Sequence, residues 1–182
     1  MGYSNKPSET KIVDGSMKNR IKPKAGQESV WDYPRSPRLE ASTKQIKVYW
    51  QDQLIAETNQ AFRILETSHP PVYYLPASAI SENWVQASRQ RQTFCEWKGQ
   101  AVYWDIVDPQ GGTVSTAAAW SYPGPNARYS AIRDYLAFYP SRVTACYVND
   151  EPVQAQAGDF YGGWITKDIV GPFKGEPGTW GW

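Results

Sequence analysis

The only histidine of the chain lies three residues after a glutamate, in the segment Leu65-Glu66-Thr67-Ser68-His69-Pro70-Pro71. An imidazole titrates close to neutral pH, and a nearby carboxylate can tune it for proton transfer. Positions three apart on a strand face opposite sides, so Glu66 and His69 converge only if the chain turns at Ser68. The pair is predicted to exchange protons as a catalytic acid and base. The alternative is a histidine at a strand end that satisfies a buried carbonyl.

The segment Thr93-Phe94-Cys95-Glu96-Trp97-Lys98-Gly99 holds the second chemically interesting residue, Cys95. A thiol becomes a nucleophile when a base or a cation lowers its pKa, and Lys98 and His69 are the residues that could do so. Cys95 is predicted as the nucleophile of an enzyme that uses Glu66 and His69. The alternative is a buried strand cysteine, which is what we expect of Cys146.

Aromatic side chains form the most prominent clusters, and several of them stand beside arginine or lysine. A guanidinium fork next to an aromatic plane suits a planar anionic ligand or a stacked base. The alternative is core packing with arginines lying over the aromatic rings. The predicted ligand contacts are Arg35, Arg38, Arg63, Tyr74, Trp97, Lys98, Trp120, Tyr161 and Trp164.

Several common site types lack their sequence signature. A structural zinc site needs four Cys or His ligands, whereas this chain has two cysteines and one histidine and no Cys-x-x-Cys pair. We therefore predict no metal, and the cofactor stays unknown. There is no Walker A loop, no Gly-x-Gly-x-x-Gly and no Gly-x-Ser-x-Gly, so phosphate-loop and serine-hydrolase chemistry lose their main support.

The composition of the chain limits which binding partners and which cellular location we expect. Lys and Arg number 19 against 18 Asp and Glu, a net charge of +1, so we expect no nucleic acid. No run of about 18 apolar residues is present, and we expect no membrane span. Two cysteines do not make a disulfide framework, and no secretory signal is visible, so the expected location is the cytoplasm. The oligomeric state stays open, with a homodimer among the options.

The elements that must position these residues are mainly strands. Trp, Tyr and Phe number 9, 12 and 5, and leucine is scarce, so we expect a core built mainly from aromatic side chains. Residues 1–28 are basic and poor in apolar side chains, and they are predicted to form a flexible arm before a single domain over residues 29–182. Alternating apolar and polar residues predict strands and hairpins in segments 46–58, 62–67, 94–107, 113–122, 136–139, 144–154 and 164–166.

Helix signals are few. Pro76 predicts a short helix that reaches Trp84, and residues 126–135 predict another turn or two. The expected class is all-β with minor α.

The motifs taken together resemble one known family. Two of the segments that carry the resemblance are quoted above, the one from Leu65, which continues to Tyr73-Tyr74-x-Pro76, and the one from Thr93 to Gly99. The others are Trp31-Asp32-Tyr33-Pro34-Arg35-x-Pro37-Arg38, Ala119-Trp120-Ser121-Tyr122-Pro123, Ala137-Phe138-Tyr139-Pro140, Phe160-Tyr161-Gly162-Gly163-Trp164-Ile165-Thr166 and Gly171-Pro172-Phe173-Lys174-Gly175. In this order they are similar to the family called domain of unknown function 427, over residues 30–182.

The resemblance implies a β-tent, in which small antiparallel sheets lean together, as in yippee proteins and methionine sulfoxide reductase B. Many β-tent proteins hold zinc on paired Cys-x-x-Cys loops, which this chain lacks, so zinc and reductase chemistry do not carry over. The family is sometimes labelled nucleotidyltransferase-like, but no pair of close carboxylates for two-metal catalysis is visible here.

Three functions follow. The leading hypothesis is a small-molecule-binding domain with an aromatic pocket that contains Arg and Lys and takes a planar or anionic ligand. The second is an enzyme that uses Glu66 and His69, with Cys95 as nucleophile. The third is a structural or protein-interaction module whose aromatics are core. The pocket hypothesis predicts that nine of these residues surround one cavity. They are Glu66, His69, Tyr74, Cys95, Trp97, Lys98, Trp120, Tyr161 and Trp164.

Overall fold

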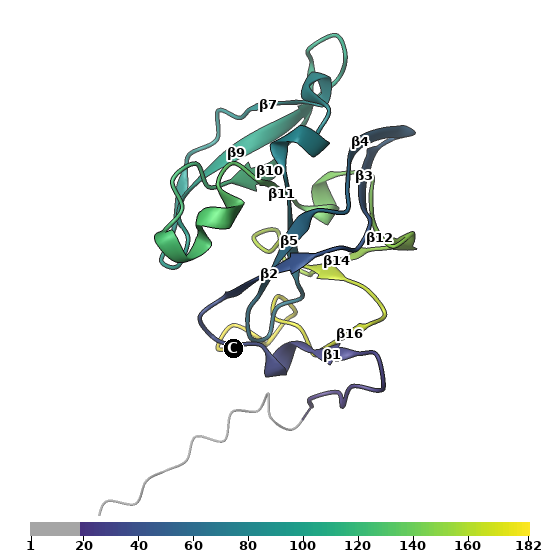
Figure 1. Ribbon diagram of the computed structural model, residues 1–182, viewed down its shortest axis with the longest axis vertical. Helices are drawn as coiled ribbons and strands as arrows, with labels where there is room; N and C mark the ends of the chain where they lie inside the picture. The colour runs from purple at the N-terminus through teal and green to yellow at the C-terminus, as the bar shows by residue number, and fades with distance from the viewer. Residues whose placement is uncertain (1–18) are drawn as a thin grey trace, which may run out of the picture.

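The computed structural model describes residues 19–182, so the first 18 residues of the predicted arm lie outside the described residues (Figure 1). The strands are β1 (Glu28–Ser29), β2 (Arg38–Ser42), β3 (Ile46–Trp50), β4 (Gln53–Thr58), β5 (Ala61–Leu65), β6 (Val72–Leu75), β7 (Val85–Ala87), β8 (Thr93–Cys95), β9 (Gly99–Val107), β10 (Thr113–Ser121), β11 (Leu136–Phe138), β12 (Ala145–Val148), β13 (Glu151–Pro152), β14 (Gln154–Ala155), β15 (Trp164–Ile165) and β16 (Ile169–Val170). The 3-10 helices are η2 (Val30–Asp32), η3 (Ala77–Ala79), η4 (Glu82–Trp84), η5 (Ala127–Ile132) and η6 (Pro140–Arg142).

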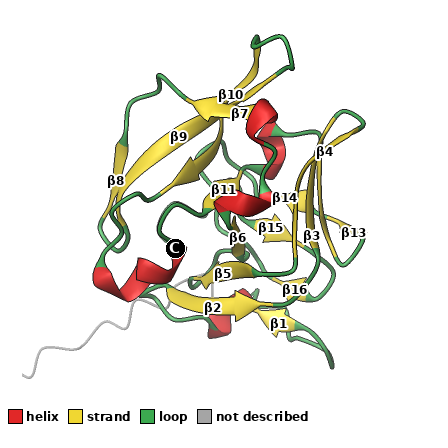
Figure 2. Cartoon of the chain, turned by 45° about the horizontal axis from the view of Figure 1, so that its top comes forward, coloured by secondary structure: helices red, strands yellow, loops and turns green. Residues whose placement is uncertain are grey.

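The predicted all-β class with small antiparallel sheets and short helices is confirmed. The largest sheet runs in the order β2-β5-β6-β11-β10-β9-β7, and β8 pairs with β9 at its edge. A second sheet has the order β13-β12-β3-β4, and two-stranded pairs β1-β16 and β14-β15 complete the fold. Figures 1 and 2 show β3 and β4 standing beside the long sheet, and β1 and β16 at the end of the molecule away from β7.

Two predicted hairpins form with the expected turns. β3 pairs with β4 around residues 51–52, and β8 pairs with β9 in the register Cys95 to Gly99. Gly99 has a φ of +102°, a conformation that glycine adopts at little cost, and this lets the chain reverse directly after Lys98. The hairpin therefore fixes where Cys95 and Lys98 lie.

Strand alternation sorts the aromatic side chains onto the two faces of the large sheet. Tyr73 and Phe138 lie in the core between this sheet and the four-stranded one, together with residues of β3 and β4. Their neighbours Tyr74 and Tyr139 belong to a second cluster, which also holds Trp120. Successive side chains of a strand point to opposite faces, so one sheet builds two aromatic layers. Residues of the second layer line the cavity described below.

A bulge in the β9–β10 pair adjusts the strand that carries Trp120. The register shifts between Ser115 and Ala119, and Ala117 has a positive φ of 47°. The Ala117 N–H, left without a ladder partner, donates to the buried carboxylate of Asp105 at 2.7 Å. Such bulges bend a strand and re-aim its side chains.

The single helix predicted from Pro76 to Trp84 is wrong. Two separate 3-10 helices, η3 and η4, occupy this stretch, because Ile80 between them is extended and forms a β-bridge with Ala56. The other predicted helical turns correspond to η5.

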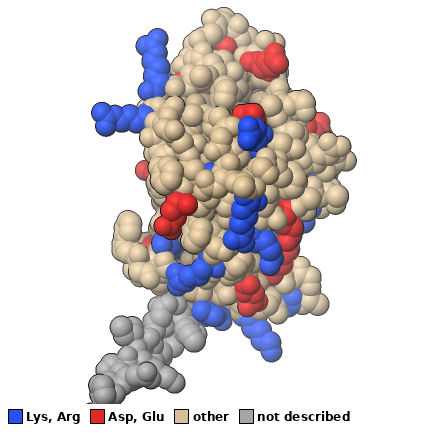
Figure 3. All heavy atoms as spheres, turned by 60° about the vertical axis from the view of Figure 1, so that its left-hand side comes forward, with Lys and Arg blue, Asp and Glu red and all other residues tan. Residues whose placement is uncertain are grey.

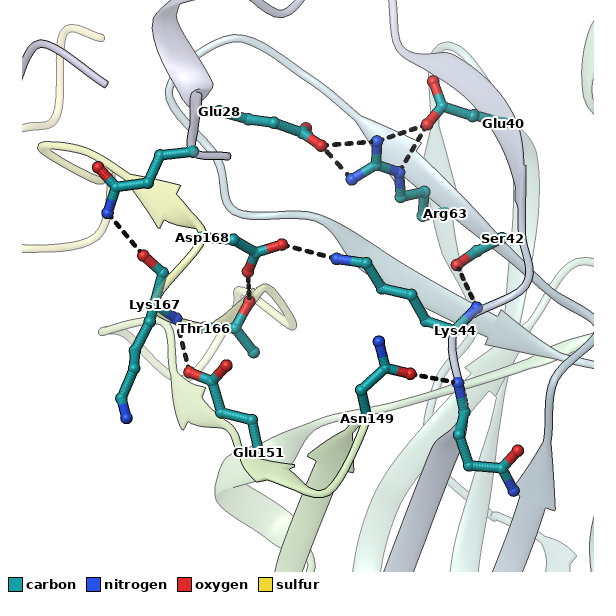
Figure 4. Close-up of polar contacts among 12 residues, drawn as sticks. Glu28, Glu40, Ser42, Lys44, Arg63, Asn149, Glu151, Thr166, Lys167 and Asp168 are labelled. Atoms are coloured by element: carbon teal, nitrogen blue, oxygen red, sulfur yellow. Dashed lines mark hydrogen bonds and ion pairs between the residues drawn. The ribbon is translucent and has the colours of Figure 1, made fainter. Parts of the chain in front are cut away.

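The described part of the predicted arm is attached to the chain's C-terminal region. The Ile21 N–H donates to the Gly171 carbonyl, and Glu28 pairs in parallel with Ile169. The Glu28 carboxylate also accepts from Arg63, which bonds Glu40 of β2 as well (Figure 4). This fork ties β1 to the large sheet.

No helix within residues 19–182 is long and apolar enough to cross a membrane. On the face shown in Figure 3, Lys and Arg are interspersed with Asp and Glu over a largely uncharged surface.

Candidate functional site

A cavity of about 470 Å³ lies on the face of the large sheet opposite the four-stranded sheet. The β8–β9 hairpin, the turn before β6, the loop before β15 and one residue of the C-terminal segment surround it. The lining residues are Ile64, Glu66, His69, Pro70, Val72, Tyr74, Thr93, Phe94, Cys95, Glu96, Trp97, Lys98, Ala101, Tyr103, Trp120, Tyr122, Tyr139, Gln156, Phe160, Tyr161, Gly162 and Lys174.

A row of cross-strand neighbours forms the aromatic wall. Tyr74 on β6 is opposite Ala137 on β11, which is opposite Trp120 on β10, which is opposite Tyr103 on β9. Directly opposite residues share a face, so all four point the same way. Ala137 is the small member, and across it the Trp120 indole N–H donates to the Tyr74 hydroxyl at 3.1 Å. Residue size within the row thus sets where the two large rings meet.

Lys98 provides a buried cation at this wall. The residue is 8% exposed, and its Nζ lies 5.9 Å from the centre of the Tyr122 ring. None of the ion pairs found in residues 19–182 includes Lys98. Within residues 19–182 the Lys98 ammonium makes no hydrogen bond, and no fully buried side-chain nitrogen or oxygen lacks a partner, so the ammonium keeps some access to solvent. A largely buried lysine is ordinarily paired, and an anion in the cavity would supply its counter-charge.

One ring nitrogen of His69 is hydrogen-bonded within the turn, and the other is available to a ligand. Its Nδ1 lies 2.9 Å from the Thr67 carbonyl, an acceptor, so Nδ1 carries the proton in the neutral ring and Nε2 is the acceptor. The alternative role considered for His69, satisfying a backbone carbonyl, therefore occupies Nδ1 alone. Burial lowers the pKa of His69, and the charges of Lys174 and Lys98 lower it further, against opposing contributions from the Thr67 bond and Glu66. No hydrogen bond to Nε2 is found among residues 19–182, and a neutral imidazole with this nitrogen available has the form that a general base requires.

The buried phenols act as neutral groups. Burial raises the pKa values of Tyr74, Tyr122 and Tyr139 far above the ordinary value. These side chains stay protonated at every physiological pH. They can donate to a ligand and do not add negative charge to the cavity.

The rim of the cavity carries exposed aromatic rings. Phe94 on the hairpin is 77% exposed and Phe160 on the loop before β15 is 75% exposed, and Trp97 is 37% exposed. Gly162 follows on the same loop at a point where a Cβ would lie 2.3 Å from the Trp120 ring. The loop can approach the aromatic wall this closely only because residue 162 has no side chain.

Eight of the nine residues predicted to surround one cavity line it. They are Glu66, His69, Tyr74, Cys95, Trp97, Lys98, Trp120 and Tyr161. The ninth, Trp164, does not. It is fully buried on the opposite face, where its indole N–H donates to the Phe138 carbonyl and its ring packs on Tyr73.

None of the three predicted arginine contacts lies at the cavity. Arg63 is bonded to Glu28 and Glu40 (Figure 4). Arg38 lies 3.6 Å from Glu40, and both arginines line a separate hollow. The local sequence does not show these pairings, since Glu28 and Arg63 are 35 residues apart. Arg35 lines a smaller hollow that adjoins the cavity.

Several cavity residues were missed by the sequence prediction. Strand parity could have found Tyr122, two residues after Trp120, and Tyr139, two residues after Ala137, because alternate residues share a face. Phe160 is next to the predicted Tyr161. Lys174 has no local signal, because only the path of the C-terminal segment brings it to the site.

Within residues 19–182, no three His, Cys, Asp or Glu side chains gather in a way that could hold a metal ion. The groups that line the cavity are the ammoniums of Lys98 and Lys174, the imidazole of His69, the carboxylates of Glu66 and Glu96, the thiol of Cys95 and the aromatic wall.

Comparison with known protein families places the chain in context. A protein family described as a domain of unknown function (DUF427) matches residues 38–149. None of the curated proteins compared with the chain matches it. The matched range contains the turn, the hairpin and the aromatic row, while the loop with Phe160 and the segment with Lys174 lie beyond it.

Proposed function

Because the chain belongs to the family of domains of unknown function called DUF427, whose description names no activity, we propose a function from the cavity itself. The protein binds a small planar molecule that carries an anionic group. The observation that carries this proposal is Lys98, an ammonium at an aromatic wall with no acidic partner in the described part of the chain.

The wall favours a planar ligand. Trp120, Tyr74 and Tyr139 are buried against one another, with the Trp120 and Tyr139 ring centres 4.4 Å apart, so they form a firm apolar surface. Flat apolar groups bury area on such a surface and gain offset or edge contacts with the rings. The volume of about 470 Å³ is in the range of sites for small molecules.

Lys98 favours an anion. A hydrogen bond to a charged group is worth about 1.5–3 kcal/mol. Removing the Lys98 ammonium is expected to lower the affinity for an anionic ligand roughly ten- to hundredfold, since about 1.4 kcal/mol corresponds to a factor of ten in the dissociation constant.

The test uses two probes of nearly the same shape, 1-naphthoate and the uncharged 1-naphthamide. Isothermal titration calorimetry measures each with the parent protein, with Lys98→Met and with the control Lys167→Met. Lys167 has an exposed side chain and does not line the cavity. We expect naphthoate to bind more tightly than naphthamide, and only Lys98→Met to remove the difference.

Two results would contradict the proposal. If the parent protein bound the acid and the amide with equal affinity, the site would not recognise the anionic group. If Lys98→Met and Lys167→Met bound naphthoate with equal affinity, Lys98 would not contribute to naphthoate binding.

A further inference from the structure

A second, smaller hollow adjoins the aromatic cavity across the turn that carries Glu66 and His69. Its volume is about 120 Å³. Three titratable residues line both spaces, namely Glu66, His69 and Lys174. The remaining lining residues are Trp31, Arg35, Thr67, Ser68 and Trp182. Charged and polar groups therefore form the boundary between the two spaces.

Two cations face this hollow and one acid opposes them. Among residues 19–182, neither Arg35 nor Lys174 takes part in an ion pair. The Lys174 ammonium donates to the backbone oxygen of Trp182 at 2.6 Å, which uses one of its three N–H groups. The side chains around the hollow therefore bring two positive charges, from Arg35 and Lys174, against the one negative charge of Glu66.

The size of the hollow fits a small polyatomic group. A single water needs about 10–15 Å³ of comparable volume, so 120 Å³ is room for a group of several heavy atoms. Guanidinium presents a fork that matches two oxygens of a carboxylate, phosphate or sulfate, and ammonium adds a compact charge.

We infer that this hollow, which we call the Arg35 hollow, binds a small oxyanion group through Arg35 and Lys174. The group is either a free oxyanion or the second acidic group of the ligand in the aromatic cavity. The second form rests on the proposed function, and it narrows the ligand class to planar molecules with two separated anionic groups, one at Lys98 and one at Arg35. The oxyanion site itself stands on the geometry of the hollow alone.

The test uses sulfate as the probe, because it stays a dianion from pH 5 to pH 8. The protein is labelled with ¹⁵N at its tryptophan indoles, and sulfate is titrated against a chloride background of matched ionic strength. The indole signals of Trp31 and Trp182 report on the hollow, and Trp120 reports on the large cavity. The variants are Arg35→Gln and the control Arg133→Gln, whose arginine is exposed and lines neither space.

We expect saturable shifts of the Trp31 and Trp182 signals, with a sulfate affinity reduced at least about fivefold in Arg35→Gln and unchanged in Arg133→Gln. A linear response, or equal behaviour of the two variants, would overturn the inference. Lys98→Met separates the two proposals, because it is expected to lose naphthoate binding and to keep the sulfate response.

The two sources of the oxyanion are separated by a second pair of probes. Naphthalene-1,5-dicarboxylate is compared with 1-naphthoate in the parent protein and in Arg35→Gln. A gain of at least about fivefold for the diacid that disappears in Arg35→Gln assigns the hollow to the ligand's second acid. No gain, together with saturable sulfate binding, assigns it to a free oxyanion and overturns the two-acid ligand class.

Discussion

His69 shows how one side chain can fill a structural and a chemical role at the same time. Its Nδ1 holds the turn by bonding the Thr67 carbonyl, and this bond leaves Nε2 as the acceptor. The positive φ of Ser68, 69°, is the turn that the sequence required for Glu66 and His69 to meet at one site. The residue types were predictable from a seven-residue segment, whereas the partner of each nitrogen was not.

The lowered pKa of His69 predicts a pH dependence of stability. Burial is its largest cause, so the folded protein releases the proton more readily than the unfolded chain, in which histidine titrates near about 6.5. The unfolded chain therefore binds more protons as the pH falls through this range, and stability is present above about pH 6.5 and lost as the pH falls through the folded pKa.

Urea unfolding of the parent protein and of His69→Gln between pH 8 and pH 5 measures this dependence. We expect the free energy of unfolding of the parent to fall more steeply than that of the variant over this interval. Parallel curves would show that His69 keeps its ordinary pKa in the folded protein. The difference between the two proteins removes the contribution of carboxylates, which both share.

At the scale of elements, the site is built by a sheet face and by two connections that close over it. The aromatic row follows from strand register, and the β8–β9 hairpin adds Cys95 and Lys98. The loop before β15 brings Tyr161 and Gly162 against Trp120. Period-2 patterns predicted the strands, but a pattern cannot tell which loop will cover which face.

Gly162 provides a test of that loop. A Cβ at residue 162 would lie 2.3 Å from Cη2 and 2.8 Å from Cζ3 of Trp120, so Gly162→Ala must displace the ring or the loop. The expected cost is about 1–3 kcal/mol of stability. Weaker naphthoate binding should accompany it, since Trp120 lines the cavity.

Gly124→Ala is the matched control, because its added Cβ would meet nothing within 4 Å. Urea unfolding and calorimetry compare the two alanine variants. If both variants were as stable as the parent and bound naphthoate equally well, the loop would not lie against the wall as described.

At the scale of the whole molecule, polar links between distant segments hold the two ends of the described chain on the sheets. Arg63 of β5 bonds Glu28 of β1 at 3.0 Å and Glu40 of β2 at 2.5 Å. Lys44 bonds Asp168 at 2.6 Å near β16 (Figure 4). Arg63, which the sequence suggested for ligand binding, connects β1 to the large sheet.

Arg63→Met tests this connection. The Arg63 side chain is only 12% exposed, while both of its carboxylate partners are more than a third exposed and can be hydrated when it is lost. We expect a loss of about 1–3 kcal/mol, centred on the β1–β16 pair. Hydrogen exchange at the Glu28 amide, which bonds the Asp168 carbonyl, measures it.

Lys47→Met is the control for Arg63→Met. Lys47 pairs with Asp150, whose side chain is 80% exposed, so this pair should matter little. Equal protection of the Glu28 amide in the two variants would show that the Arg63 fork does not hold the N-terminal segment. Unchanged naphthoate binding in Arg63→Met is also expected, because the residue is not at the cavity.

The sequence by itself determined the class of fold and most residue types of the site. Alternation along short segments records which side chains share a strand face, so the hairpins at residues 51–52 and 98–99 and the aromatic clusters could be located from local pattern. These are properties of neighbours in the chain, and local sterics and periodicity are sufficient to specify them.

The tertiary structure decided which face each cluster would serve and which charges would be left free. Trp164 and Trp120 are both tryptophans in strands, yet one is core and the other lines the cavity. Within residues 19–182, carboxylates distant in sequence form ion pairs with Arg63, and none forms an ion pair with Lys98. Burial and pairing depend on contacts between segments far apart in the chain, and local sequence carries no measure of them.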